Sequence, residues 1–278
     1  MTQLNRREFA LKVSALAMGA GLTCIPKRIQ AIVQPSPKAK FTLGIGSYTF
    51  RKLPPDLMIE RLHLLQIDTI ELSHPQTMLP RARVEDFGSL SELFKKGNIQ
   101  VRSWYCSGVK SNDDIQKVLE IAKILGIQHV SGDTTGESLL ALDKAFQKNG
   151  LYFGIHNHFF KDGKFEYQSP EDFLKVFSIT SNHIGATLDT GHMVSCGYDP
   201  VEAFQQLKPR VQLIHLKDVV GPGTDKNVLF GTGKGKPTEM VKMLVQERFD
   251  GLVAIEYEEG EDPQEDVEKC VKFVRAIE

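Results

Sequence analysis

The feature that most constrains the fold is an eightfold alternation of short apolar runs and segments with helical spacing. The runs are rich in β-branched residues, and patterns such as Met58/Leu62/Leu65 lie between them. They cover residues 41–48, 68–72, 99–104, 127–131, 151–156, 184–189, 211–216 and 252–257. Because parallel strands need crossover segments, this order favours a parallel sheet. Eight such units in about 240 residues match a closed (β/α)8 barrel, so we predict an α/β fold with a single TIM barrel.

An open doubly wound sheet is the competing fold for the same alternation. Its dinucleotide-binding form has a glycine-rich phosphate loop between the first strand and the first helix. Here Gly44-Ile45-Gly46 lies within the first run and leads to Tyr48 rather than into a helix. Prolines and acids mark the expected helix starts. They occur at Pro54-Pro55-Asp56, Ser169-Pro170-Glu171, Tyr198-Asp199-Pro200 and Asp262-Pro263.

Residues 1–37 have the composition of an export signal. Arg6 and Arg7 precede a short apolar stretch, Val13–Ile25, which is too short to form a stable membrane span. The paired arginines resemble a twin-arginine signal, which exports proteins already folded. We therefore predict a twin-arginine-like signal peptide and linker over 1–37, the barrel over 38–278, and a periplasmic or otherwise exported protein. The alternative is that the segment forms a first amphipathic helix of the domain.

The charge of the remaining chain argues against binding to nucleic acid. Five of the 34 basic residues but only one of the 35 acidic residues lie in residues 1–37, which leaves the rest with a formal net charge of −5. An acidic domain gains no electrostatic attraction to a phosphate backbone. We expect the acidic stretch Glu258–Asp262 to be a solvated loop.

Polar residues follow the later apolar runs at the points where each predicted strand ends. In a TIM barrel these ends share one rim, which carries the active site. The fifth to eighth runs deliver two imidazoles and two carboxylates, namely His156, Asp189, His215 and Glu256. Each alone could be a helix cap or a hydrogen-bonded surface group, but four together would repel one another without a cation. We predict one divalent metal ion, with Mn²⁺, Zn²⁺, Co²⁺, Fe²⁺ or Mg²⁺ preferred over Ca²⁺.

Three of these strand ends carry strings that resemble a known superfamily. They are Leu-Asp-Thr-Gly-His at 188–192, Ile-His-Leu-Lys-Asp at 214–218 and Ile-Glu-Tyr-Glu at 255–258. The chain resembles the sugar phosphate isomerase/epimerase superfamily, the xylose isomerase-like TIM barrels. These also include ketose 3-epimerases, inosose and dehydroshikimate dehydratases, and endonuclease IV. The resemblance covers the whole chain after the signal and is specific for the superfamily, but not for one reaction.

The resemblance implies a metal at the ends of the fifth to eighth strands. Asp189, His215 and Glu256 fall on ligand positions of the superfamily. His156 is a departure, because many ketose epimerases have at that position a glutamate that is both a ligand and one of two opposed acid/base groups. Here the motif is His-Asn-His.

Further residues are candidates for contact with a small carbohydrate substrate. By resemblance, Glu71 falls where many members have a substrate-contacting acid, and His192 and Lys217 fall where members touch substrate oxygens. His158 could contact substrate or support the metal ligands. Trp104 could stack on a sugar face at the barrel mouth or pack in the core.

The predicted chemistry is isomerisation or epimerisation of a sugar or keto-sugar through an enediolate. A metal polarises the carbonyl group, Glu256 removes the adjacent proton, and Lys217 or His192 holds or protonates the developing oxyanion. Epimerisation also needs a proton from the opposite face, from His156, His158, Lys217 or water.

Three other functions compete with this prediction. A lyase or dehydratase acting on a 3-keto-sugar or inosose-like substrate needs only one base and an acid, and the His156 departure favours it. A non-catalytic metal- and sugar-binding protein is the second. An endonuclease-IV-like enzyme is the third, and the acidic charge and the predicted export argue against it.

Overall fold

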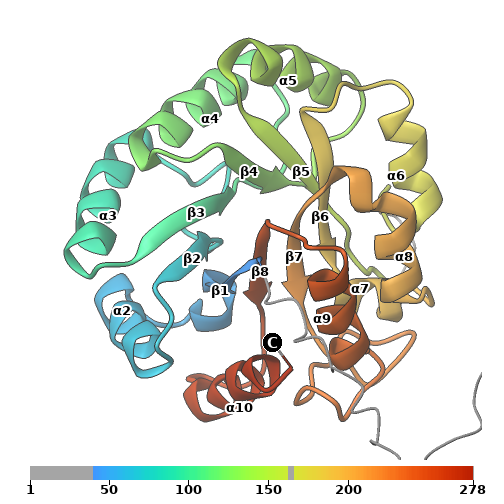
Figure 1. Ribbon diagram of the computed structural model, residues 1–278. Helices are drawn as coiled ribbons and strands as arrows, with labels where there is room; N and C mark the ends of the chain where they lie inside the picture. Colours follow the sequence, from blue (N-terminus) through green and yellow to red (C-terminus); the bar gives the residue numbers. More distant parts are fainter. Residues whose placement is uncertain (1–39, 162–165, 278) are drawn as a thin grey trace, which may run out of the picture. The chain divides into compact units, whose positions relative to one another are not determined.

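Eight parallel strands close into a barrel in which β1 pairs with both β2 and β8 (Figure 1). The structure is a computed structural model that describes residues 40–161 and 166–277. The strands are β1 (Thr42–Gly46), β2 (Thr69–Leu72), β3 (Gln100–Tyr105), β4 (His129–Gly132), β5 (Tyr152–His156), β6 (Ile184–Asp189), β7 (Val211–Leu216) and β8 (Leu252–Ile255). Closure confirms the predicted TIM barrel and rules out the open doubly wound sheet. The predicted signal peptide lies outside the described residues.

The helices surround the barrel in chain order (Figure 1). They are α2 (Pro55–Leu64), α3 (Val84–Lys96), α4 (Asn112–Leu125), α5 (Gly136–Asn149), α6 (Pro170–Phe177), α7 (Thr190–Ser195), α8 (Pro200–Leu207), α9 (Pro237–Gln246) and α10 (Gln264–Arg275). Two 3-10 turns, η1 (Ser47–Phe50) and η2 (Lys208–Arg210), follow β1 and α8. Within the described ranges, no helix is long and apolar enough to span a bilayer.

The proline and acid signals mark helix starts as predicted. Helices α2, α6 and α8 begin at a proline, and Pro263 is the N-cap of α10. Ser169 forms a capping box with Asp172, in which each side chain bonds the backbone N–H of the other residue. These local signals are readable from sequence because the N–H groups that they satisfy belong to the next few residues.

Some strand positions accept only glycine because a neighbouring chain passes close by. A Cβ atom built on Gly185 of β6 would lie 2.2 Å from the backbone oxygen of Arg210 and 2.8 Å from Gln212 Nε2. Real Cβ atoms do not approach backbone so closely, so a side chain there would have to push β6 away from the start of β7. Gly88 is the opposite case, since its Cβ would meet nothing within 4 Å on the exposed face of α3.

These two glycines give a paired test of the packing. We expect Gly185→Ala to lower the free energy of unfolding by about 1–3 kcal/mol, as overpacking of a core does. Gly88→Ala should raise it by up to about 1 kcal/mol, because alanine is the better helix former. Urea denaturation of both variants beside the wild type measures the two effects. Equal stabilities would contradict the close approach of β6 to Arg210.

Candidate metal centre

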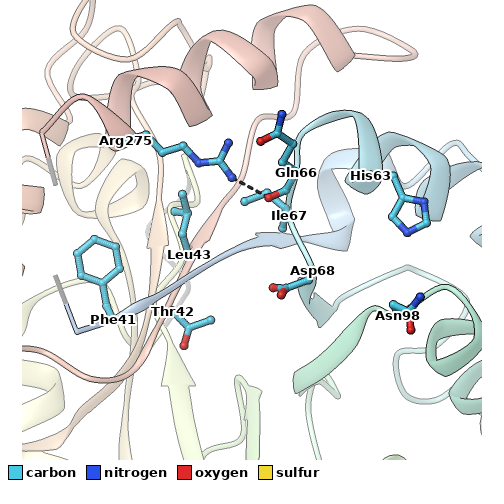
Figure 2. A pocket seen from close by; sticks show the side chains of 9 residues that line it. All are labelled: Phe41, Thr42, Leu43, His63, Gln66, Ile67, Asp68, Asn98 and Arg275. Carbon is cyan, nitrogen blue, oxygen red and sulfur yellow. Dashed lines mark hydrogen bonds between the residues drawn. The ribbon is translucent and has the colours of Figure 1, made fainter. Parts of the chain in front are cut away.

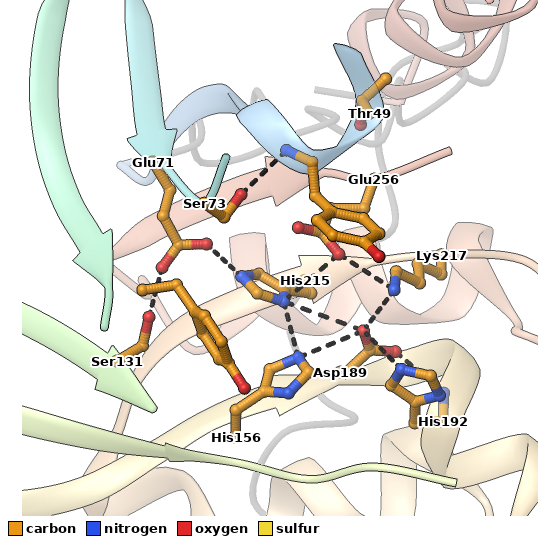
Figure 3. Close-up of polar contacts among 12 residues, drawn as sticks. Thr49, Glu71, Ser73, Ser131, His156, Asp189, His192, His215, Lys217 and Glu256 are labelled. Atoms are coloured by element: carbon orange, nitrogen blue, oxygen red, sulfur yellow. Dashed lines mark hydrogen bonds and ion pairs between the residues drawn. The ribbon is translucent and has the colours of Figure 1, made fainter. Parts of the chain in front are cut away.

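The ends of β5 to β8 bring together the four residues predicted as metal ligands. His156 and Asp189 are the last residues of β5 and β6, His215 lies one residue before the end of β7, and Glu256 directly follows β8. All four side chains are buried. Figure 3 shows them pointing toward one another at the centre of the barrel.

The ligand atoms have the spacing of a coordination shell. His156 Nε2 lies 2.8 Å from His215 Nδ1 and 3.5 Å from Asp189 Oδ2. His215 Nδ1 lies 3.5 Å from Glu256 Oε2 and 3.8 Å from Asp189 Oδ2. Ligands bonded to Zn²⁺ or a similar ion at about 2.0–2.2 Å are separated by about 3–4 Å. His156, Asp189 and His215 thus form one group that could hold an ion, and Glu71, His215 and Glu256 form an overlapping second group.

Asp189 divides its two oxygens between a helix and this site. Its Oδ1 caps α7 by accepting the backbone N–H of His192 at 2.8 Å. Its Oδ2 is buried and, among the described residues, accepts no hydrogen bond of normal geometry, although Lys217 Nζ lies 3.0 Å away as an ion-pair partner. Since a buried acceptor without a partner is costly, the oxygen is suited to a cation. The residues therefore fit a divalent metal held by His156, Asp189, His215 and Glu256.

Lys217 places a buried ammonium group among the carboxylates (Figure 3). Its Nζ lies 3.0 Å from Asp189 Oδ2, 2.9 Å from Glu256 Oε2 and 2.5 Å from Glu258 Oε1. Burial alone lowers the pKa of Lys217, but the three carboxylates outweigh it and raise that pKa well above the ordinary value. Lys217 is therefore a fixed positive charge at neutral pH.

Glu258 departs from the sequence expectation of a solvated loop. Its carboxylate holds Lys217, which lowers the pKa of Glu258 although burial opposes the change. Only the side chains further along the loop, such as that of Glu261, are exposed.

Glu71 supports His215 from beneath rather than facing the cavity. It is wholly buried, and it accepts from Ser103 Oγ at 3.1 Å and Ser131 Oγ at 2.5 Å and contacts His215 Nε2. The structure therefore does not bring Glu71 to the cavity lining, because both of its oxygens are engaged within the barrel. With Nε2 occupied by Glu71, His215 presents Nδ1 to the other ligand atoms.

The carboxylates also set the protonation of His215. Burial lowers its pKa, but Glu256, Glu71 and Asp189 together raise it to about 9. A proton on His215 thus supplies positive charge at this position. A bound metal would supply that charge instead, so metal binding would release the proton.

Trp104 lies outside the site, which corrects the suggestion that it stacks on a sugar. Its side chain is wholly buried, its Nε1 donates to the backbone oxygen of Thr77 at 3.0 Å, and its ring meets Phe87 of α3 edge-on. Successive strand residues point to opposite faces. Ser103 points into the barrel toward Glu71, so Trp104 points out into the helix layer.

A cavity of about 380 Å³ opens above the metal ligands. Its lining includes His156, His215 and Glu256 at the base and His158, His192 and Asp133 around them. Burial lowers the pKa of His158 and takes that of His192 to about 4, so both rings are neutral at pH 7 and suited to hydrogen bonds. The structure thus brings His158 and His192 to the cavity, as the sequence predicted.

Asp133 and Tyr105 are further residues of this cavity that the sequence interpretation missed. Asp133 directly follows β4, so the rule that found the metal ligands also applies to it. Tyr105 ends β3 and bonds His158 Nε2 through its hydroxyl group at 3.0 Å.

A second cavity lies at the opposite end of the barrel. It measures about 650 Å³ and is lined by residues at the start of β1 and before β2, with Arg275 of α10 across it (Figure 2). Neither of the possible metal groups found among the described residues lies there. Size alone therefore does not identify the active site.

Glu71 offers a test of the metal centre that leaves the ligands unchanged. We expect Glu71→Gln to lower affinity for Zn²⁺ about 10–100-fold, because the amide no longer fixes His215 with a charged acceptor. Competition with a chromophoric chelator measures the affinity, and Glu85→Gln on the exposed face of α3 is the control. Unchanged affinity in Glu71→Gln would contradict the role of Glu71.

The fold has counterparts among known proteins. Residues 67–277 match the family model for the xylose isomerase-like TIM barrel. An inosose dehydratase from Bacillus thuringiensis (strain Al Hakam) is 26% identical over 159 residues, which is 50% of this chain and 52% of that protein. The chain thus spans about half the length of the curated relatives that it matches.

Two solved structures share the architecture over most of the chain. A D-tagatose 3-epimerase-like protein superimposes with a TM-score of 0.68 and 17% identity over 85% of this chain and 98% of that one. The IolI protein with a bound zinc atom gives 0.67 and 17% with the same coverage. These likenesses agree in fold with the family match, which covers most of the sequence. The chain therefore belongs to the family of xylose isomerase-like TIM barrels.

Proposed function

We propose that the protein is a metal-dependent isomerase or epimerase that acts on a keto-sugar through an enediolate. The observation that carries the proposal is the position of Glu256. Its carboxylate lines the cavity, 2.9 Å from Lys217 Nζ and 3.5 Å from His215 Nδ1. A base that is held beside a fixed positive charge and the metal ligands is suited to take a proton from the carbon next to a carbonyl group.

The metal would be held by His156, Asp189, His215 and Glu256. When bound, it would polarise the substrate carbonyl and stabilise negative charge on its oxygen. Support for such an ion comes from Asp189 Oδ2, a buried oxygen that accepts no hydrogen bond of normal geometry from the described residues, and from the zinc named for IolI.

The cavity residues divide the remaining tasks. Glu256 removes the proton, and Lys217 offers its permanent charge to the oxygen on which negative charge develops. His158 and His192 are neutral and can donate to or accept from substrate hydroxyl groups. A cavity of about 380 Å³ with several polar groups suits a small carbohydrate better than a polymer.

A lyase or dehydratase is the second candidate. His156 replaces a carboxylate that many epimerases use as one of two opposed bases, and the sequence is similar to inosose dehydratases. Elimination needs one base and an acid for the leaving oxygen, and this site has both. A non-catalytic binding protein is the third candidate and predicts no chemistry at all.

Deuterium exchange distinguishes these functions. Metal-loaded protein would be incubated in D₂O with D-tagatose, D-fructose and an inosose and followed by NMR. We expect deuterium at the carbon next to the carbonyl group together with an isomer or epimer. Loss of water would favour the dehydratase, and no exchange with any substrate would contradict both enzymatic functions.

Glu256→Gln tests the assignment of the base. We expect exchange to fall about 10²–10⁴-fold, which is the usual contribution of general base catalysis. Because an amide oxygen is a weaker ligand than a carboxylate, exchange would be compared at saturating metal, with metal content measured in parallel to show that the site is filled. Glu261→Gln, on the exposed part of the same loop, is the matched control and should exchange at the wild-type rate. Unimpaired exchange in Glu256→Gln would rule out Glu256 as the base.

A further inference from the structure

Asp133 lies across the barrel mouth from Glu256. It follows β4, whereas Glu256 follows β8, and in a closed ring of eight strands these two are diametrically opposed (Figure 1). Both side chains line the same cavity above the metal ligands. Any substrate held in that cavity would therefore lie between them.

The carboxylate of Asp133 has an oxygen that could accept a hydrogen bond from a substrate. Its Oδ1 is buried and has no hydrogen-bond partner among the described residues. Of the described residues that line the cavity, Asp133 is the one with such an atom. An unsatisfied buried acceptor is destabilising, and a substrate group or a proton on the carboxyl group would relieve that cost. Burial also raises the pKa of Asp133, which favours a carboxyl group that carries a proton.

Three other groups that could deliver a proton, His156, His158 and Lys217, already make contacts within the site. His156 directs Nε2 at His215 at 2.8 Å and Nδ1 at His158 at 3.0 Å. His158 also contacts the hydroxyl group of Tyr105 through Nε2. Lys217 is held by three carboxylates on the same side as Glu256. None of these groups follows the strand opposite Glu256, and each already makes contacts within the site. Asp133 is therefore the better candidate.

We propose that Asp133 is the second proton-transfer residue of this enzyme, acting on the substrate face opposite Glu256. This assignment rests on the proposed function. Asp133 would supply the second acid/base group, for which many epimerases use a carboxylate at the position of His156.

The proton balance closes over one turnover. Glu256 takes the proton from the carbon, and the electrons of that C–H bond move onto the carbonyl oxygen as the enediolate forms. Asp133 then gives its proton to the same carbon from the other face, and the electrons return to re-form C=O. Nothing is oxidised or reduced. Glu256 ends protonated and Asp133 ionised, and exchange with water resets both.

The test separates removal of the proton from its delivery. Metal-loaded, full-length Asp133→Asn would be incubated in D₂O with D-tagatose, D-fructose and an inosose. We expect deuterium exchange within about threefold of the wild type, because Glu256 still removes and returns the proton on its own face. Epimer formation should fall about 10²–10⁴-fold. The control is Glu137→Gln, an exposed carboxylate in the first turn of α5, which should leave both rates unchanged.

A second variant guards against a purely structural effect. In Asp133→Ala, added formate should restore part of the lost epimerisation, since a small acid can enter the vacated space and donate a proton. A structural role would not respond to formate.

The outcomes distinguish the two proposals. If the wild type exchanges deuterium and Asp133→Asn still forms epimer at a rate within threefold of the wild type, the assignment of Asp133 is overturned and the proposed function is not. If the wild type eliminates water and forms no epimer, the proposed delivery of a proton from Asp133 to carbon is also overturned. A wild type without exchange overturns the proposed function and this assignment with it.

Discussion

The site depends on balancing buried negative charge. Glu71, Asp189, Glu256 and Glu258 gather at one end of the barrel, where unpaired carboxylates would be strongly destabilising. Lys217 binds three of them, and His215 lies against the fourth while also facing Asp189 and Glu256. Lys217 and protonated His215 thus make this polar cluster compatible with an apolar barrel, and a bound divalent ion would take over the charge of the His215 proton.

The barrel leaves room for that cluster through small residues at its rim. A Cβ atom on Gly46, the last residue of β1, would lie 2.4 Å from Glu256 Oε1. Glycine there leaves room for the Glu256 carboxylate beside β1. The opposite end of the barrel, where the larger cavity lies, carries no such charge cluster within the described residues. This is the usual division in TIM barrels between a functional rim and a structural one.

Much of the fold and the metal group could be predicted because both follow from local patterns. Apolar runs, helix caps and the shared rim of strand ends placed His156, Asp189, His215 and Glu256 without knowledge of any contact. Glu71 and Trp104 could not be assigned in this way, because their roles depend on which face of a strand each side chain takes. The register shift between Ile70 and Glu71, where β2 pairs with β3, sets that direction and has no sequence signal.

Glu258 and Asp133 illustrate the other limit. An acid in a charged loop looks solvated until a lysine from a neighbouring strand is found beside it, as Lys217 is beside Glu258. For Asp133 the distinguishing property is a missing partner, which only packing reveals. Roles of this kind are the hardest to predict, because tertiary contacts define them.

The divided carboxylate of Asp189 makes helix α7 an extension of the metal centre. Asp189 Oδ1 accepts a hydrogen bond in the first turn of α7, and Asp189 Oδ2 faces the ligand atoms. Any rotation of this carboxylate therefore also displaces the helix cap. His192 lies in that first turn and reaches the cavity. A shift of that carboxylate would therefore be passed to His192, an imidazole that lines the cavity, through the helix cap.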